Sequence, residues 1–205
     1  MALRIAVLVS GEGTNLQAIL DAAHDRDAIE VVCVGASRPD ARGLQRARAA
    51  GVRTGVFAKS DHPDREARDA ALGTWIDDQA ADLIVLAGFM EVLGGPFIRR
   101  FERRVINVHP SLLPAFPGVR AIEQALDYGA RVTGVTVHFV DEGVDSGPVI
   151  LQEAFALPYA RDIEAIEARV HEIEHRLLPR AVELIAAGAV SIDEHNPRLV
   201  HVADA

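Results

Sequence analysis

Hydrophobic residues in the first half of the chain fall into short apolar runs separated by segments with helical spacing. The apolar runs cover residues 3–9, 30–36, 53–57 and 82–87. Between them, apolar residues recur at helical spacing through Leu16, Ile19 and Leu20, and again over residues 41–50 and 65–80. Parallel strands need long crossover connections, so this alternation predicts a parallel sheet with helices on both faces.

The pattern changes after a strand predicted at residues 105–109. A short helix is expected over residues 121–126, and strands over 133–140 and 148–155. The tight connection at 141–147 makes these two strands antiparallel. A long amphipathic helix follows over 162–187, and a small hairpin over 190–202 turns at Asn196 and Pro197. The chain is therefore predicted to be one α/β domain, residues 1–205.

Composition narrows the class of protein. The 205 residues carry a formal charge of −9, which argues against nucleic acid as the main partner because phosphate-backbone binding needs a basic surface. Cys33 is the only cysteine, so no intrachain disulfide is possible and a reducing compartment is expected. The sequence indicates neither a signal peptide nor a membrane span, which together predict a cytoplasmic protein.

Asn107 and His109 form the first candidate catalytic pair. Side chains two residues apart on a strand share a face, and Pro110 stops the strand directly after them. An amide and a titratable ring held side by side can stabilise negative charge that develops on an oxygen.

Gly11 to Asn15 connects the first strand to a helix, where free backbone N–H groups and the helix dipole attract an anion. A phosphate suits this position, provided that Glu12 points away from it. The loop lacks the Gly-Lys-Ser/Thr of a Walker loop and the third glycine of the dinucleotide fingerprint. Glycines that simply form the turn are the alternative.

Two further loops have both a functional and a structural interpretation. Residues 88–93 close the fourth strand and either wall a flat ligand, if the sheet reverses between its first and fourth strands, or pack beneath the loop. The acidic loop 141–147 is either a solvated turn or the source of a carboxylate that keeps an imidazole protonated.

Two further hypotheses involve histidine, one for a metal site and one for a binding role on the long helix. A metal site of His109, His138 and Asp145 is a rival that no recognised ligand spacing supports, so no metal is expected. On the long helix, His171 and Glu174 share a face, and a plain surface pair is the alternative to a binding role.

Four stretches together resemble the glycinamide ribonucleotide formyltransferase family. They are residues 9–19 (VSGEGTNLQAI), 86–90 (LAGFM), 107–114 (NVHPSLLP), and 137–140 (VHFV) continuing to 145–150 (DSGPVI). The resemblance implies a Rossmann-like open twisted sheet, mostly parallel in the N-terminal half and with antiparallel strands in the C-terminal half. Residues 1–105 would bind the nucleotide phosphate, and 106–205 would bind folate and perform catalysis.

The resemblance also implies roles for individual residues. Asn107, His109 and Asp145 correspond to the catalytic group. The residues implied to bind the substrate are Gly13, Thr14, Asn15, His171, Glu172, Ile173 and Glu174. Folate binding falls on Arg65, Met90, Glu91, Val92, Leu93, Asn107, Asp141, Glu142, Gly143, Val144 and Asp145. Glu91 stands where family members often carry a basic or neutral residue, and Val119 to Ile122 replace a segment that often contains histidine after Pro-Gly. The role of Arg120 in that segment is open, and an anionic ligand would suit it.

The implied reaction is formyl transfer from 10-formyltetrahydrofolate to the amine of glycinamide ribonucleotide in purine biosynthesis. Both partners are small molecules, and the protein would be a monomer or a homodimer. The alternatives are a hydrolase that deformylates the same folate and a non-catalytic nucleotide-binding module. The second would leave Asn107, His109 and Asp145 without a purpose.

Overall fold

A computed structural model describes residues 1–23, 28–158 and 162–203 of the chain. It divides into two compact units, Met1–Ile106 and Asn107–Ala205. The division of function between the two halves stays a prediction.

The first unit alternates strands and helices, as the apolar pattern predicts. Its elements are β1 (Leu3–Val9), α1 (Thr14–Ala23), β2 (Ile29–Ala36), α2 (Arg42–Ala49), β3 (Arg53–Val56), the 3-10 helix η1 (Lys59–Asp61), α3 (Arg65–Asp78), β4 (Leu83–Leu86) and α4 (Gly95–Arg100). β1 pairs in parallel with β2 on one side and with β4 on the other, and β2 pairs in parallel with β3. The reversal expected between the first and fourth strands is therefore present, and it sets the loops after β1 and β4 at the point where open α/β sheets bind ligands.

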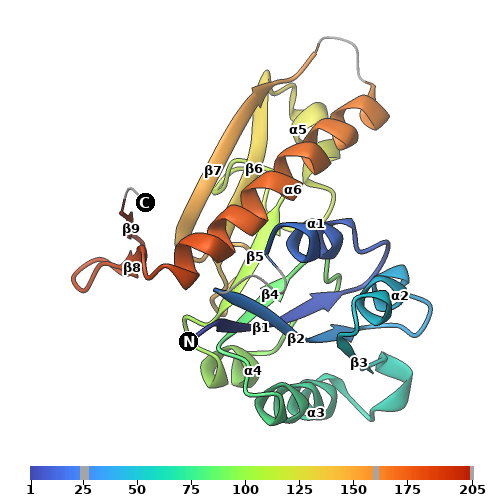
Figure 1. Ribbon diagram of the computed structural model, residues 1–205. Coiled ribbons are helices and arrows are strands. Elements are labelled where there is room, and N and C mark those ends of the chain that lie inside the picture. The colour runs from blue at the N-terminus through green and yellow to red at the C-terminus, as the bar shows by residue number, and fades with distance from the viewer. Residues whose placement is uncertain (24–27, 159–161, 204–205) are drawn as a thin grey trace. The chain divides into compact units, whose positions relative to one another are not determined.

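Burial explains why these runs become strands. Residues Ile5 to Val9 of β1 and the whole of β4 are buried, as expected for strands that are covered on both faces. Figure 1 shows α1 and α2 on one side of these strands and α3 and α4 on the other. Asp64 caps the start of α3 by accepting a hydrogen bond from the Ala67 amide at 2.8 Å.

Two short elements were not predicted. Helix α4 begins at Gly95, with Gly94 as its N-cap and Pro96 in its first turn. Such a run of glycine and proline is typical of a turn. It also suits a helix start, where proline loses no hydrogen bond. Phe97 and Ile98 of α4 are buried, so tertiary packing stabilises this short helix. The second element, η1, is a single turn.

The second unit contains the predicted antiparallel strands and the long helix. Its elements are β5 (Val105–His109), which starts in the first unit, α5 (Ala121–Tyr128), β6 (Val132–Phe139), β7 (Val149–Ala156), α6 (Ile163–Ala186), β8 (Val190–Ile192) and β9 (Val200–Val202). β6 and β7 pair antiparallel, and so do β8 and β9. Helix α6 packs on β6 and β7 through a buried stripe of Ile166, Val170, Ile173 and Leu177, which recur every three or four residues.

The strand order of the sheet is β3-β2-β1-β4-β5-β6-β7. The predicted fold class is thus confirmed: a mixed, seven-stranded sheet with parallel strands in the N-terminal half, an antiparallel pair in the C-terminal half, and helices packed on it.

Candidate active site

The three predicted catalytic residues meet within the second unit. Asn107 and His109 lie two residues apart on β5, and Asp145 lies in the loop between β6 and β7. His109 Nδ1 is 3.3 Å from Asp145 Oδ2, and Asn107 Nδ2 is 3.5 Å from Asp145 Oδ1. The expected proximity of Asp145 to the strand-end pair is therefore present.

His138 is a fourth member of this cluster, and no catalytic role was predicted for it from the sequence. Its Nε2 lies 3.3 Å from Asn107 Nδ2 and 3.6 Å from Asp145 Oδ1. Its Nδ1 is 2.8 Å from the Phe139 carbonyl oxygen, which can only accept a hydrogen bond, so Nδ1 carries a proton. In the neutral ring, Nε2 then accepts from Asn107. The contacts of the Asn107 amide, at 3.3 and 3.5 Å, are longer than ordinary hydrogen bonds.

A loop formed by residues 116–120, here called the support loop, holds both His109 and Asp145 through its backbone. The Phe116 carbonyl oxygen lies 2.9 Å from His109 Nε2, and the Gly118 amide donates to Asp145 Oδ2 at 2.7 Å. His109 thus faces an acceptor at each ring nitrogen, and only the doubly protonated imidazolium satisfies both.

The chain that leaves β5 is fixed by β6 and β7. Thr136 Oγ1 donates to the Ser111 carbonyl at 2.7 Å and accepts from the Leu113 amide at 3.1 Å. Gln152 Nε2 donates to the Leu113 carbonyl at 2.8 Å. These bonds, of which the two made by Thr136 are buried, keep His109 at a defined strand end.

Burial and hydrogen bonding act in opposite directions on the two titratable partners. Burial lowers the pKa of His109 below its ordinary value of 6.5, and the Phe116 carbonyl and the Asp145 carboxylate raise it without cancelling that effect, while His138 lowers it further. Burial raises the pKa of Asp145, but the adjacent His138 ring, the hydrogen bond from the Gly118 amide and the charge of His109 outweigh it and bring this pKa to about 2. Asp145 is therefore a carboxylate at neutral pH.

The acidic loop around Asp145 is internally braced. Asp141 Oδ1 accepts from the Gly143 amide at 3.1 Å and from Ser146 Oγ at 2.7 Å, whereas Glu142, Gly143 and Val144 are exposed. Beyond Asp145, a Cβ at Gly147 would collide with the Phe139 carbonyl oxygen. The loop is thus a shaped turn in which Asp145 has a left-handed backbone, with φ of 48°.

In the first unit, the glycine loop after β1 is shaped by contact with the start of α2. Gly13 has φ of +70°, and a Cβ there would lie 2.5 Å from Gly43 Cα. Arg42 Nη1 donates to the Glu12 carboxylate at 2.8 Å, and Arg46 Nε donates to the Glu12 carbonyl at 2.8 Å. Gly13 therefore has a structural reason to be glycine, and the acidic side chain of Glu12 is engaged by an arginine of α2.

Ser10 joins the glycine loop to the loop that follows β4. The Ser10 amide donates to the Gly88 carbonyl at 3.0 Å, and Ser10 Oγ accepts from the Met90 amide at 2.8 Å. Ser10 Oγ also lies 2.7 Å from Ser37 Oγ at the end of β2. The two loops at the switch point of the sheet are thus hydrogen-bonded to each other. Thr14 and Asn15 form the first turn of α1 beside them.

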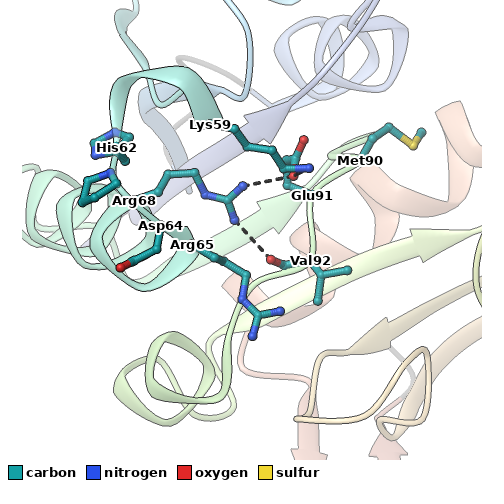
Figure 2. Close-up of a pocket in the computed structure, with 9 residues that line it drawn as sticks. Lys59, His62, Asp64, Arg65, Arg68, Met90, Glu91 and Val92 are labelled. Atoms are coloured by element: carbon teal, nitrogen blue, oxygen red, sulfur yellow. Dashed lines mark hydrogen bonds and ion pairs between the residues drawn. The ribbon is translucent and has the colours of Figure 1, made fainter.

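Part of the predicted folate site gathers around one pocket of the first unit. The pocket, about 400 Å³, is lined by Lys59, His62, Pro63, Asp64, Arg65, Arg68, Met90, Glu91 and Val92 (Figure 2). The buried Arg68 donates to the Glu91 carboxylate at 3.0 Å and to the Val92 carbonyl at 3.1 Å. Lys59 pairs with Glu91 at 2.7 Å. Arg65, Met90, Glu91 and Val92 therefore share this pocket.

Glu91 is anionic in this setting because its partners are cationic. Burial raises the pKa of Glu91, but hydrogen bonds from Lys59 and Arg68 outweigh it, so the pKa is lowered. Met90 and Val92 beside it are exposed, which contradicts packing beneath the loop for these two side chains. Leu93, the remaining predicted residue of this stretch, is half-buried.

The predicted substrate residues on α6 differ in exposure. His171 and Glu172 are exposed, and Glu172 pairs with Arg169 in the previous turn. Ile173 belongs to the core, and Glu174 is buried. His171 also stacks on His175, with ring centroids 6.1 Å apart. A role in substrate binding stays a prediction for all four.

The described residues contain neither a metal-binding cluster nor a membrane-spanning helix. Across residues 1–23, 28–158 and 162–203, no group of three or more His, Cys, Asp or Glu side chains is arranged to hold a metal ion. In that same part of the chain, no helix combines the length and the apolar character needed to cross a membrane.

Comparison with known proteins assigns the chain to a family. The model of the formyl transferase family matches residues 3–182, so the chain belongs to that family. The resemblance and the enzyme class expected from the sequence are thereby confirmed at the level of the family.

Individual relatives agree with this assignment. The chain is 38% identical over 193 residues to the phosphoribosylglycinamide formyltransferase of Haemophilus influenzae, covering 94% of this chain and 91% of that protein. It is 42% identical over 202 residues to the trifunctional purine biosynthetic protein adenosine-3 of Bos taurus, and spans only 20% of the length of that relative. The crystal structure of glycinamide ribonucleotide transformylase 1 from Symbiobacterium toebii superposes with a TM-score of 0.94 at 45% identity, covering 99% of this chain and 95% of that one.

Proposed function

We propose that this chain transfers the formyl group of 10-formyltetrahydrofolate to the amine of glycinamide ribonucleotide, a step of purine biosynthesis. The observation that supports this most is the cluster of the buried His109 with the partly buried Asn107 and Asp145 in a member of the formyl transferase family. Its relatives of similar length carry that activity in their names.

The transfer requires stabilisation of a tetrahedral oxyanion. The substrate amine attacks the formyl carbon, the carbonyl oxygen gains the negative charge, and the bond from carbon to folate N10 then breaks while a proton moves from the amine to N10. Asn107 has long amide contacts that an oxyanion can replace, so its N–H is available as a donor. No side chain needs to act as a nucleophile.

His109 supplies the second donor through Nδ1, whose 3.3 Å contact with Asp145 an oxyanion can replace. Burial favours its neutral form, whereas acceptors at both ring nitrogens favour the imidazolium. This balance leaves the ring responsive, because negative charge developing beside it raises its pKa and strengthens its hydrogen bond. Asp145, anionic at neutral pH, stabilises the charged ring and passes protons between amine and N10.

The remaining assignments follow from the family and from position. Gly13, Thr14 and Asn15, at the start of α1, are proposed to hold the substrate phosphate with backbone amides and the helix dipole. Arg65 and Met90 to Leu93 in the first unit, and Asp141 to Asp145 in the second, are proposed to contact folate. His138 is proposed as a positioning residue that orients the Asn107 amide.

An omission experiment tests the function. Purified protein is mixed with glycinamide ribonucleotide and a 10-formylfolate donor, each is left out in turn, and the deformylated folate and formate are measured. Folate product that requires the amine acceptor supports the transferase. Formate released without the acceptor would identify a hydrolase instead, and no turnover in the complete mixture would overturn an enzymatic role.

A further inference from the structure

The support loop, residues 116–120, contacts both titratable members of the cluster without contributing a side chain to it. Its Phe116 carbonyl faces His109 Nε2 at 2.9 Å, and its Gly118 amide donates to Asp145 Oδ2 at 2.7 Å. The relative placement of the imidazole and the carboxylate therefore depends on the path of this short backbone segment.

That backbone path is one the chain adopts only at a cost. Phe116 and Arg120 have φ of 53° and 61°, in the left-handed region, and Gly118 between them has φ of 80°. Non-glycine residues in this region are strained, so other contacts must hold them there. Arg120, which precedes α5, makes no side-chain cap to that helix.

Gln124 on α5 provides such contacts. Its Nε2 donates to the Pro117 carbonyl at 3.1 Å and to the Val119 carbonyl at 2.8 Å, so both hydrogens of one amide are used on the support loop. These two carbonyls flank Gly118, whose amide binds Asp145, and Pro117 follows Phe116, whose carbonyl binds His109. The Pro117 carbonyl and the Gly118 amide belong to one peptide unit, so Gln124 binds the same unit that donates to Asp145, and this unit directly follows the one whose carbonyl faces His109.

We propose that Gln124 is a positioning residue for formyl transfer, which acts by fixing the support loop so that Phe116 and Gly118 hold His109 and Asp145 in register. The proposal rests on the function proposed above. The positions of His109 and Asp145 and the protonation state of His109 can nevertheless be measured without any assay of transfer.

The pKa of His109 reports directly whether the support loop is held in place. The groups that face His109 are the Phe116 carbonyl, the Asp145 carboxylate and the His138 ring. The first two raise the pKa of His109, and both depend on the support loop. Release of the loop is therefore expected to lower this pKa further, which moves the alkaline limb of the rate profile to lower pH.

The experiment compares Gln124→Leu, which removes both donors at similar size, with Gln124→Glu, which sets a carboxylate against the two carbonyls. Gln79→Leu serves as the control, because it makes the same chemical change at the end of α3, where Gln79 Nε2 donates to the Trp75 carbonyl of its own helix. The pKa of His109 is measured by NMR titration of its ring nitrogens in each full-length protein. Transfer kinetics are measured across pH, and folding is checked by thermal unfolding.

Gln124→Leu is expected to lower kcat about tenfold at neutral pH, Gln124→Glu to lower it more, and both to recover partly at lower pH. The pKa of His109 should fall in both Gln124 variants and stay unchanged in Gln79→Leu. Folded Gln124 variants with the His109 pKa of the unmodified protein would overturn the proposal. If the unmodified protein shows no transfer at all but the pKa of His109 still falls in the Gln124 variants, the proposed function is refuted and the positioning role is supported.

Discussion

The cluster around Asp145 in the second unit and the glycine loop after β1 in the first unit are built in opposite ways. Around Asp145, side chains face one another in a buried setting, with the His109 side chain 6% exposed and that of His138 1% exposed. Around Gly13, the shape depends on backbone, through a positive φ and a close approach to Gly43, with arginine side chains bracing the loop from α2.

This difference separates two kinds of task. Buried, paired side chains have shifted pKa values and respond strongly to a new charge, which suits chemistry. A loop of shaped backbone beside a helix start offers fixed N–H groups, which suits the binding of an anion. Substitutions in the two regions should therefore alter different kinetic parameters.

The largest effect is expected from His109→Ala. Loss of an oxyanion donor typically costs ~100- to 1,000-fold in turnover, so kcat should fall by that order while KM for the ribonucleotide changes little. Steady-state kinetics with each substrate varied provides the measurement. His201→Ala makes the same chemical change at an exposed ion pair with Asp193 and should leave kcat intact. Normal turnover in a folded His109→Ala protein would refute the catalytic assignment.

The next effect concerns acid stability. The pKa of Asp145 in the folded protein is about 2, below its ordinary value of 3.8, so ionised Asp145 stabilises the fold above about pH 4. This contribution disappears as the pH falls toward 2. It corresponds to about 2 kcal/mol. Denaturant unfolding at several pH values should show Asp145→Asn to be less stable at neutral pH, with the difference shrinking over that window.

His109 acts in a separate pH range. Its folded pKa is lowered below 6.5, so the folded state holds the neutral ring and loses stability as pH falls below 6.5. His109→Gln should flatten the pH dependence of stability near pH 6 and leave the change between pH 4 and 2 unaltered.

For Asp145→Asn, a loss of unfolding free energy relative to the unmodified protein that stays constant down to pH 2 would contradict the lowered pKa of Asp145.

The smallest effect is expected in the first unit, from Gly13→Ala. The added Cβ would meet Gly43 Cα at 2.5 Å and the backbone would be strained at φ +70°, so the loop must shift. KM for the ribonucleotide should rise about tenfold with kcat nearly unchanged. Gly51→Ala is the matched control, because Gly51 has a similar φ of +71° but nothing lies within 4 Å of its added Cβ. Equal losses in kcat and KM would argue against a phosphate-holding loop.

The elements of the sheet could be predicted from the sequence because their patterns are local. The bounds of β1 and β5 coincide with the apolar runs, and the antiparallel pair follows from the short connection between two apolar strands. Helix α4 could not be predicted, because Gly94, Gly95 and Pro96 are typical of a turn and packing of Phe97 and Ile98 decides otherwise.

The site was predicted only in part, for similar reasons. Asn107 and His109 stand out at the end of a strand, but His138 lies within an alternating pattern, and its place beside Asn107 depends on the pairing of strands. The support loop could not be inferred, because Phe116 and Arg120 are residue types that rarely adopt a positive φ. Likewise, the partners of Glu91 come from positions 59 and 68, which no local pattern connects to it.

The close approach of Gly147 to β6 restricts the number of residues in the turn around Asp145 as well as its conformation. Because any side chain at this position would collide with the Phe139 carbonyl, the chain must pass close to the end of β6 directly after Ser146. A saturating library of the protein, selected for transfer activity, should accept many residues at the exposed positions 142 and 144. It should reject almost every substitution at 147, and every insertion between 141 and 147, although Gly147 offers no side chain to any ligand.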